Sequence, residues 1–134
     1  MKRISTIIIL IAISTTISAS FIFNSQNDII TDIGNAIKSG VAANVSKYFN
    51  STLDLTTPDN EGTYSKTQAE LILKDFFTKN PPESFTINHS GASNDGSLYS
   101  IGTYVSGSES FRTYFLLKKS GTSSLIQKLE FEVQ

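Results

Sequence analysis

The sequence has 134 residues, of which 39% are hydrophobic, with a formal net charge of −1 and no cysteine. This hydrophobic content is typical of a folded domain rather than a disordered chain, and the near-neutral charge argues against the basic surface that a nucleic-acid-binding protein needs. The lack of cysteine excludes disulfide bonds, thiol catalysis, cysteine-ligated metal sites and lipid attachment to a cysteine.

The first twenty residues have the three parts of a secretory signal peptide. Lys2-Arg3 supply a positive start, Ile7–Ile13 is an uninterrupted apolar run, and Ser18-Ala19-Ser20 has the small residues of a cleavage site. We therefore predict a signal peptide over residues 1–20, ending as late as Ser25, and an exported protein that is periplasmic or secreted.

The alternative for this segment is an uncleaved membrane anchor. Read generously, the stretch Ile4–Phe23 is long enough to span a bilayer, but serines and threonines dilute it. We favour cleavage, and after it we expect no stable membrane insertion. The remaining residues, 26–134, have the length of a single domain.

Three helices are expected in the first two thirds of this domain. The first is indicated by isoleucines that recur on one helical face. These are Ile29, Ile30, Ile33 and Ile37. Gly40 suits the end of this helix, and a short second helix is predicted over 42–49. Ser65 and Gln68 have the spacing of a capping box that opens a third helix, and Pro81-Pro82 ends it.

The strands are predicted from alternating apolar residues. Residues 51–57 form one strand with Leu53 and Leu55 on the same side, and Pro58–Gly62 has the composition of a turn. Four more strands follow with short loops, at 84–89, 98–105, 111–118 and 125–132, the last with Leu125, Leu129 and Phe131 facing inward. Short connections between consecutive strands predict an antiparallel meander. The fold class is therefore α+β, with a curved antiparallel sheet packed on about three helices.

This order of elements resembles the cone-like fold of nuclear transport factor 2 and its relatives, which include ketosteroid isomerases, scytalone dehydratase and polyketide cyclases. A closer resemblance, to an uncharacterised Bacteroidota-type family of exported bacterial domains, spans nearly the whole mature chain. The segments that carry it are Ala36–Gly40, Ser46–Phe49, Pro58–Lys66, Gln68–Glu70, Leu73–Phe77, Phe85–His89, Gly96–Tyr99, Ile101–Thr103 and Phe111–Lys119. That family is classed as a domain of unknown function in the nuclear transport factor 2-like (SnoaL-like) superfamily. The resemblance implies the cone-like fold and export, and it brings no catalytic residues.

His89 is the only histidine, and its imidazole could act as an acid or base near neutral pH. Strict alternation places it on the same strand face as Phe85 and Ile87, where it could look into a cavity. The alternative is a polar residue at the end of a strand, because the sequence identifies no partner that would orient a base.

Asp54 lies between Leu53 and Leu55 and should point away from them. In related folds an acidic residue on the sheet shuttles a proton while a tyrosine stabilises an oxyanion. Tyr99, Tyr104 and Tyr114 could offer such a donor, although tyrosines on half-buried strands are also ordinary packing residues. We assign no catalytic residue and keep His89, Asp54 and Tyr99 as weak candidates.

A ligand pocket would be lined by apolar residues of the third helix and the strands, which could equally be ordinary core. These are Phe76, Phe77, Phe85, Ile87, His89, Phe115 and Leu129. On the other face, Arg112, Tyr114 and Leu116 are candidates for a homodimer contact. No metal or cofactor is expected, since Asp59–Gly62 has too few oxygen ligands for calcium and is better explained as a turn.

Three functions follow from this interpretation. The first is a non-enzymatic exported module that binds a small apolar ligand or a protein partner. The second is a small lyase or isomerase that uses a cavity acid or base. The third is a purely structural dimerisation or interaction domain.

Overall fold

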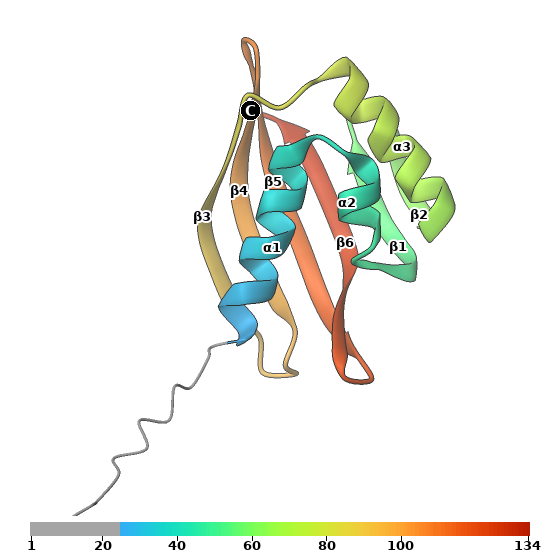
Figure 1. Cartoon of the computed structure of the whole chain (residues 1–134), viewed down its shortest axis with the longest axis vertical. Helices are drawn as coiled ribbons and strands as arrows, with labels where there is room; N and C mark the ends of the chain where they lie inside the picture. The colour runs from blue at the N-terminus through green and yellow to red at the C-terminus, as the bar shows by residue number, and fades with distance from the viewer. Residues whose placement is uncertain (1–24) are drawn as a thin grey trace, which may run out of the picture.

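The computed structural model describes residues 25–134 of the chain, with side chains from residue 28 onward (Figure 1). The predicted signal peptide lies outside the described residues. The elements in chain order are α1 (Ser25–Ser39), α2 (Ala42–Ser46), β1 (Phe49–Thr57), β2 (Asn60–Ser65), α3 (Lys66–Lys79), β3 (Ser84–Ala92), β4 (Leu98–Ser106), β5 (Glu109–Ser120) and β6 (Ser123–Val133).

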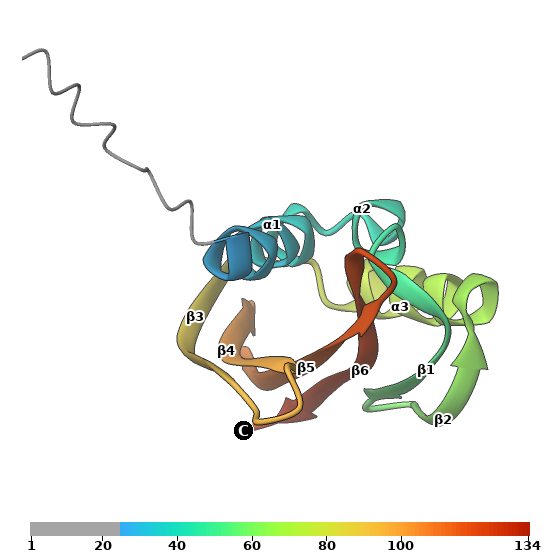
Figure 2. The same cartoon turned by 90° about the horizontal axis from the view of Figure 1, so that it is seen from below.

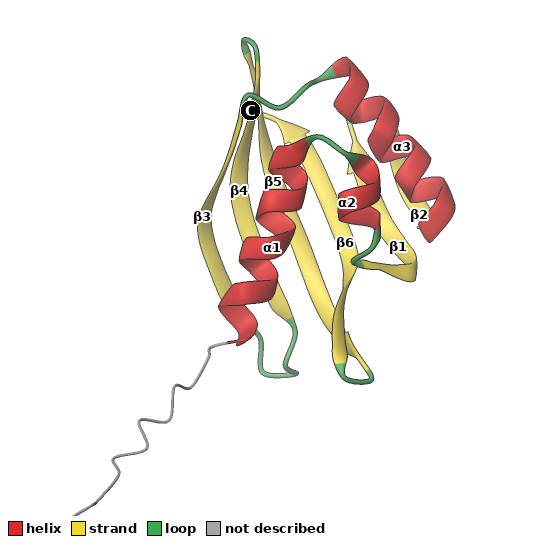
Figure 3. Ribbon diagram, in the orientation of Figure 1, coloured by secondary structure: helices red, strands yellow, loops and turns green. Residues whose placement is uncertain are grey.

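All six strands belong to one sheet in the order β2-β1-β6-β5-β4-β3. Strands β3 to β6 form the predicted antiparallel meander, and the sheet is extended by β1, which pairs with β6 in parallel. The sheet bends around the helices, all of which lie on its inner side (Figures 2 and 3). The predicted α+β class, with a curved sheet packed on three helices, is confirmed.

Strand β2 is the element that the sequence prediction missed. The predicted turn over 58–62 is a two-residue turn at Pro58-Asp59, and Thr57 already pairs with Asn60 across it. The following residues pair with β1 in an antiparallel ladder that ends at Thr52 and Ser65. Because β2 is an edge strand with little burial on either face, it lacks the apolar alternation by which a strand is recognised.

The predicted ends of the helices are largely confirmed. The Ser65 hydroxyl accepts a hydrogen bond from the Gln68 amide at 3.2 Å, and the Gln68 side chain accepts one from the Ser65 amide at 3.3 Å. Gly40 has a φ of +68° after α1, which glycine adopts at little cost. Helix α2 is shorter than predicted, because it ends at Ser46 and the buried Phe49 begins β1.

Strand β6 departs from the predicted alternation. Its partner on β5 shifts between Leu116, which pairs with Lys128, and Leu117, which pairs with Ile126. Gln127, between Ile126 and Lys128, has no partner on β5. As in a β-bulge, this extra residue reverses which face of the sheet the preceding side chains point to. As a result Ile126 is fully buried and Leu125, which was predicted to face inward, is only half-buried.

Aromatic side chains fill one end of the space between helices and sheet. The Phe76 ring of α3 lies 4.5 Å from that of Phe131 and 5.3 Å from that of Phe111, measured between ring centroids. Tyr104 completes the cluster, is fully buried, and donates its hydroxyl to the carbonyl of Asn80. This aromatic cluster (Phe76, Phe77, Tyr104, Phe111 and Phe131) closes the end of the sheet at which β4 and β6 finish.

Burial of Tyr104 makes the fold sensitive to alkaline pH. Burial raises the pKa of its phenol above the ordinary value of 10.0. A raised pKa in the folded state means that the stabilisation is complete below pH 10 and is lost as the pH rises above that value. We expect the free energy of unfolding, measured by urea denaturation, to fall from pH 9 to pH 11. At pH 7, Tyr104→Phe should be less stable than the parent by about 1 kcal/mol, because the hydrogen bond is lost. Its free energy of unfolding should fall less steeply between pH 9 and pH 11. Parallel curves of unfolding free energy against pH for the two proteins would contradict this prediction.

Thr113 offers a second test of the core. It lies on β5 opposite Gly102 and Phe131, is fully buried, and its hydroxyl has no hydrogen-bond partner among the described residues. Because an unsatisfied buried hydroxyl costs free energy, Thr113→Val should raise the free energy of unfolding by about 1 kcal/mol.

The matched control for this substitution is Thr103→Val. The Thr103 hydroxyl accepts a hydrogen bond from the Asn88 side chain at 2.8 Å, so its removal should bring no such gain. A loss of stability in Thr113→Val would show that the buried hydroxyl has a partner.

Candidate functional site: a pocket at the open end of the sheet

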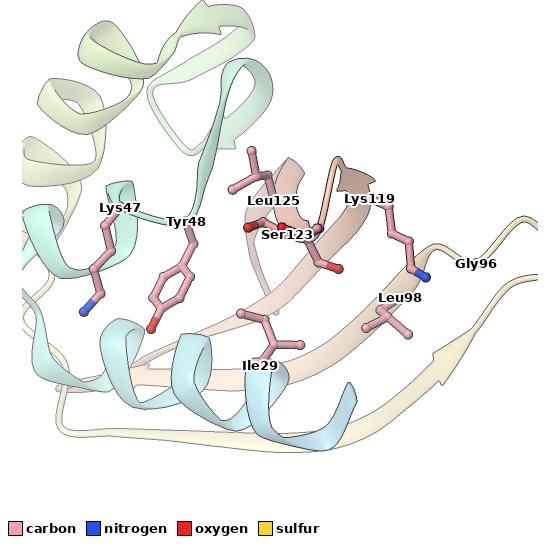
Figure 4. A pocket seen from close by; sticks show the side chains of 10 residues that line it. Ile29, Lys47, Tyr48, Gly96, Leu98, Lys119, Ser123 and Leu125 are labelled. Atoms are coloured by element: carbon pink, nitrogen blue, oxygen red, sulfur yellow. The ribbon is translucent and has the colours of Figure 1, made fainter. Parts of the chain in front are cut away.

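A hollow of about 500 Å³ lies at the end of the sheet opposite the aromatic cluster (Figure 4). Its walls come from α1, the α2–β1 link, the β3–β4 loop and β4, and the β5–β6 hairpin. The apolar lining residues are Ile29, Tyr48, Leu98 and Leu125, and the polar ones are Lys47, Lys119, Thr122, Ser123 and Ser124, with Gly96 at the loop. We call this site the open-end pocket.

Local backbone contacts hold two walls of this pocket in place. The Ile126 amide donates to the Tyr48 carbonyl at 2.7 Å, which ties the α2–β1 link to β6. The β5–β6 turn is short because Ser120 pairs with Ser123, and Gly121 has a φ of +64° there. Side chains that border the pocket therefore sit on a tight hairpin and a hydrogen-bonded link rather than on long loops.

The alternation of β5 determines which of two neighbouring lysines reaches the pocket. Leu117 is buried on the inner face, so Lys119, two residues later, projects on the same side while Lys118 projects on the other. Lys119 accordingly lines the pocket and Lys118 does not. Lys47 follows α2 directly, and its ammonium lies 5.3 Å from the centroid of the Tyr48 ring.

The pocket lining is positively charged. It contains two lysines and no aspartate, glutamate or histidine. Within residues 28–134, neither Lys47 nor Lys119 forms an ion pair. Asp95 precedes Gly96 at the rim, but its carboxylate accepts a hydrogen bond from the Ser97 amide at 3.0 Å. That hydrogen bond lowers the pKa of Asp95, with a smaller contribution from the charge of Lys118.

None of the seven residues predicted to line a pocket borders the open-end pocket. Four of them are buried parts of the main core: Phe76, Phe77, Phe115 and Leu129. Phe85 and Ile87 are partly buried under α1, and a Cβ on Gly34 would lie only 2.9 Å from the Ile87 Cδ1. Phe85 and Ile87 border a small hollow of about 150 Å³ beside α1, and Phe77 borders a hollow of about 480 Å³ beside α2 and α3.

His89 lies on the face of the sheet opposite to the one expected from strict alternation. Ile87 pairs with Gly102 and His89 with Ile101, so Asn88 is an extra residue in β3. Because such a bulge reverses the phase of a strand, His89 shares the outer face with Tyr99 and is exposed. Its Nε2 lies 3.1 Å from the Tyr99 hydroxyl.

The other catalytic candidates also lie outside the pocket. Asp54 is exposed on β1 and accepts a hydrogen bond from the Thr63 hydroxyl at 2.6 Å. Two strands, β6 and β5, separate it from Tyr99 on β4. The structure therefore brings His89 and Tyr99 together but not Asp54. In the described part of the chain, no group of three or more histidines and acidic residues could hold a metal ion.

Arg112, Tyr114 and Leu116 lie on the outer face, as predicted, and each is partly exposed. On the neighbouring strand β4, Ile101 pairs with Tyr114 and Tyr99 pairs with Leu116. Tyr99, Ile101, Tyr114 and Leu116 thus form a contiguous apolar set, which we call the outer-face patch. Beside it on β6, Lys128 and Glu130 form an ion pair of 2.8 Å.

The sequence analysis missed the two lysines of the open-end pocket. One signal for Lys119 was available, since it continues the inward alternation of Phe115 and Leu117 up to the Ser120-Gly121 turn. No comparable signal marks Lys47, because its place depends on the pairing of the α2–β1 link with β6.

Comparisons with known proteins agree with the geometry. A family described as "Domain of unknown function (DUF4783)" matches residues 30–132. The structure is similar to crystal structures of DUF4783 family proteins from Bacteroides ovatus (28% identity, 77% of this chain and 93% of that chain, TM-score 0.72) and Bacteroides uniformis (24%, 78% and 95%, TM-score 0.72).

A more distant similarity supports the fold. An NTF2-like protein of unknown function from Cytophaga hutchinsonii is 9% identical, with 81% of this chain and 89% of that chain covered and a TM-score of 0.58. No curated protein matches the chain. Among the described helices, none combines the length and the apolar character needed to cross a membrane.

Proposed function

The chain belongs to the DUF4783 family of domains of unknown function, and we propose that it is an exported, non-enzymatic module that binds a small ligand in the open-end pocket. The observation that carries this proposal is the hollow of about 500 Å³ at the open end of the sheet, where residues of α1, the α2–β1 link, β4 and the β5–β6 hairpin meet. That volume lies within the range of small-molecule sites.

The lining has the composition of a binding site. Ile29, Leu98 and Leu125 supply apolar surface, and hydroxyls on the β5–β6 hairpin supply a few polar groups. Apolar walls with few, well-placed polar groups are typical of small-ligand pockets. The apolar part of a ligand would be buried against these side chains, which are already held in place by packing against the core.

The pocket lining contains no histidine, aspartate or glutamate, which favours binding over catalysis. General acid–base catalysis needs a titratable group within hydrogen-bond reach of the substrate. The catalytic candidates His89 and Asp54 are exposed on the outer face, on β3 and β1. Asp54 borders only a small hollow of about 180 Å³ on the outer face, which is below the volume typical of a small-molecule site, so the enzyme hypothesis is the weaker one.

Export is part of the proposal and rests on the sequence. Lys2-Arg3 precede the apolar run Ile7–Ile13, and small residues follow it, which is the order of a secretory signal. A periplasmic or secreted binding module needs no cofactor to act, since its function is to hold a ligand.

Filling the pocket should abolish binding of an apolar probe. Ser124 lies half-buried in the pocket lining, so Ser124→Phe places a ring where a ligand would sit. With the neutral dye N-phenyl-1-naphthylamine, we expect the parent protein to give a fluorescence increase that saturates near one dye per chain. Ser124→Phe should weaken binding at least about tenfold, the equivalent of about 1.4 kcal/mol.

The matched control is Ser108→Phe, which adds the same ring at an exposed turn residue between β4 and β5, at the opposite end of the sheet. It should bind the dye like the parent. No dye binding by the parent, or equal binding by the parent and Ser124→Phe, would contradict the proposal.

A second role, homodimerisation, is favoured by the outer-face patch. Four apolar residues lie together on β4 and β5, and charges of both signs surround them, with Arg112 opposite Glu132 and Lys128 paired with Glu130. Two copies related by a twofold axis could bury the patches against each other and match these charges. This role is compatible with ligand binding, because the pocket lies on the other side of the sheet.

Tyr114→Glu tests the dimer. A carboxylate at the centre of the patch should abolish association, because it would be buried without a partner. In sedimentation velocity we expect the parent to run as a dimer and Tyr114→Glu as a monomer, while Ser108→Glu, with the same charge far from the patch, stays dimeric. A monomeric parent or a dimeric Tyr114→Glu would refute this contact.

A further inference from the structure

We infer that the ligand of the open-end pocket is an amphipathic anion, a molecule with an apolar body and a carboxylate or phosphate group that is attracted by the charges of Lys47 and Lys119. This inference rests on the proposed binding function and specifies its ligand. Figure 4 shows the two lysines at opposite edges of the pocket with their ammonium groups directed outward, Lys47 beside Tyr48 on the α2–β1 link and Lys119 near Leu98.

The charge of the pocket is the first argument. The chain as a whole carries 11 basic and 12 acidic residues, yet the pocket lining has two lysines and no acidic residue. The positive charge of this site is therefore not a reflection of the average composition. Within residues 28–134 neither ammonium is neutralised by an ion pair, so both remain available to an anionic ligand.

The nearest acidic residues along the chain do not cancel this charge. Asp28 precedes Ile29, and Asp95 precedes Gly96, but neither lines the pocket. Asp95 is engaged by the Ser97 amide, and the charge that acts on it is that of Lys118, on the other face of β5.

The polar groups beside Lys119 fit an oxyanion. Thr122, Ser123 and Ser124 line the same wall, and their hydroxyls can donate to carboxylate or phosphate oxygens. Lysine binds such groups as a point charge and imposes no planar geometry. The site therefore selects for negative charge and for an apolar body, and its lysines accept either a carboxylate or a phosphate.

The apolar residues determine where the body of the ligand lies. Tyr48 and Ile29 lie between the two lysines, and Leu98 lies beside Lys119. A chain or ring placed against these residues would leave its acidic group at the rim. Both lysines are exposed there, so they need not be desolvated to attract the anion.

Three eight-carbon probes separate the charge from the apolar body: octanoate, octyl phosphate and 1-octanol. The purified protein, in the processed form in which the producing cell accumulates it, is titrated with each probe by isothermal titration calorimetry at pH 7 and low salt. We expect octanoate or octyl phosphate to bind about tenfold tighter than 1-octanol. Lys47→Gln and Lys119→Gln should each weaken the anion about two- to fivefold, as expected for exposed charge pairs, and leave 1-octanol unchanged.

Lys118→Gln is the matched control, because it removes the same charge from the adjacent residue on the other face; it should bind all probes like the parent. The stronger of the two anions identifies the headgroup. Equal affinity for 1-octanol and both anions, unaffected by either pocket lysine, would overturn the anion inference and leave the binding function standing. Failure of the parent to bind any of the three probes would overturn both.

Discussion

The packing of the aromatic side chains of α3 against Phe111 of β5 and Phe131 of β6 is the interaction on which the rest of the structure depends. Phe76 lies at its centre, in contact distance of the rings of Phe111 and Phe131. Because aromatic side chains bury large areas and pack edge to face, this contact commits one end of the sheet to a solid core. The curvature of the sheet then leaves the opposite end without comparable filling. The open-end pocket lies at that opposite end, bordered by four apolar side chains together with lysines, serines and a threonine.

Elements with regular apolar patterns could be predicted from the sequence, and elements defined by pairing alone could not. Strands β4 and β5 alternate clearly, and the capping box at Ser65 and Gln68 locates the start of α3. Strand β2 escaped prediction because an edge strand with two polar faces owes its structure to hydrogen bonds with β1, and composition carries no record of such bonds. The parallel pairing of β1 with β6 joins segments more than seventy residues apart in sequence. No local pattern encodes that contact, yet it places Tyr48, and with it Lys47, at the pocket.

Two bulges account for the two residues whose strand face the prediction reversed, His89 and Leu125. A strict period of two is the only rule a sequence offers for strand faces, and one extra residue reverses it. At Asn88 the reversal moves His89 to the solvent side; in β6 the reversal buries Ile126 and leaves Leu125 half-exposed. The first bulge adjoins His89, a catalytic candidate, and the second lies close to Leu125, which lines the open-end pocket. The chemistry expected from the only histidine is therefore separated from the hollow by the thickness of the sheet, and the pocket takes its character from lysines and hydroxyls instead of an acid–base pair.

The position of β6 has a consequence for how the chain reaches this structure. The last strand of the sequence lies between β1 and β5 in the middle of the sheet, so β1 and β2 cannot join the other strands until the final residues are present. Contacts between distant segments slow folding, because the chain must close a large loop before they form. A polypeptide that emerges from its amino end, whether from the ribosome or through a translocation channel, would stay incompletely folded until almost its last residue was delivered. Such a topology keeps β1 and β2 from completing the sheet until β6 is available to pair with β1.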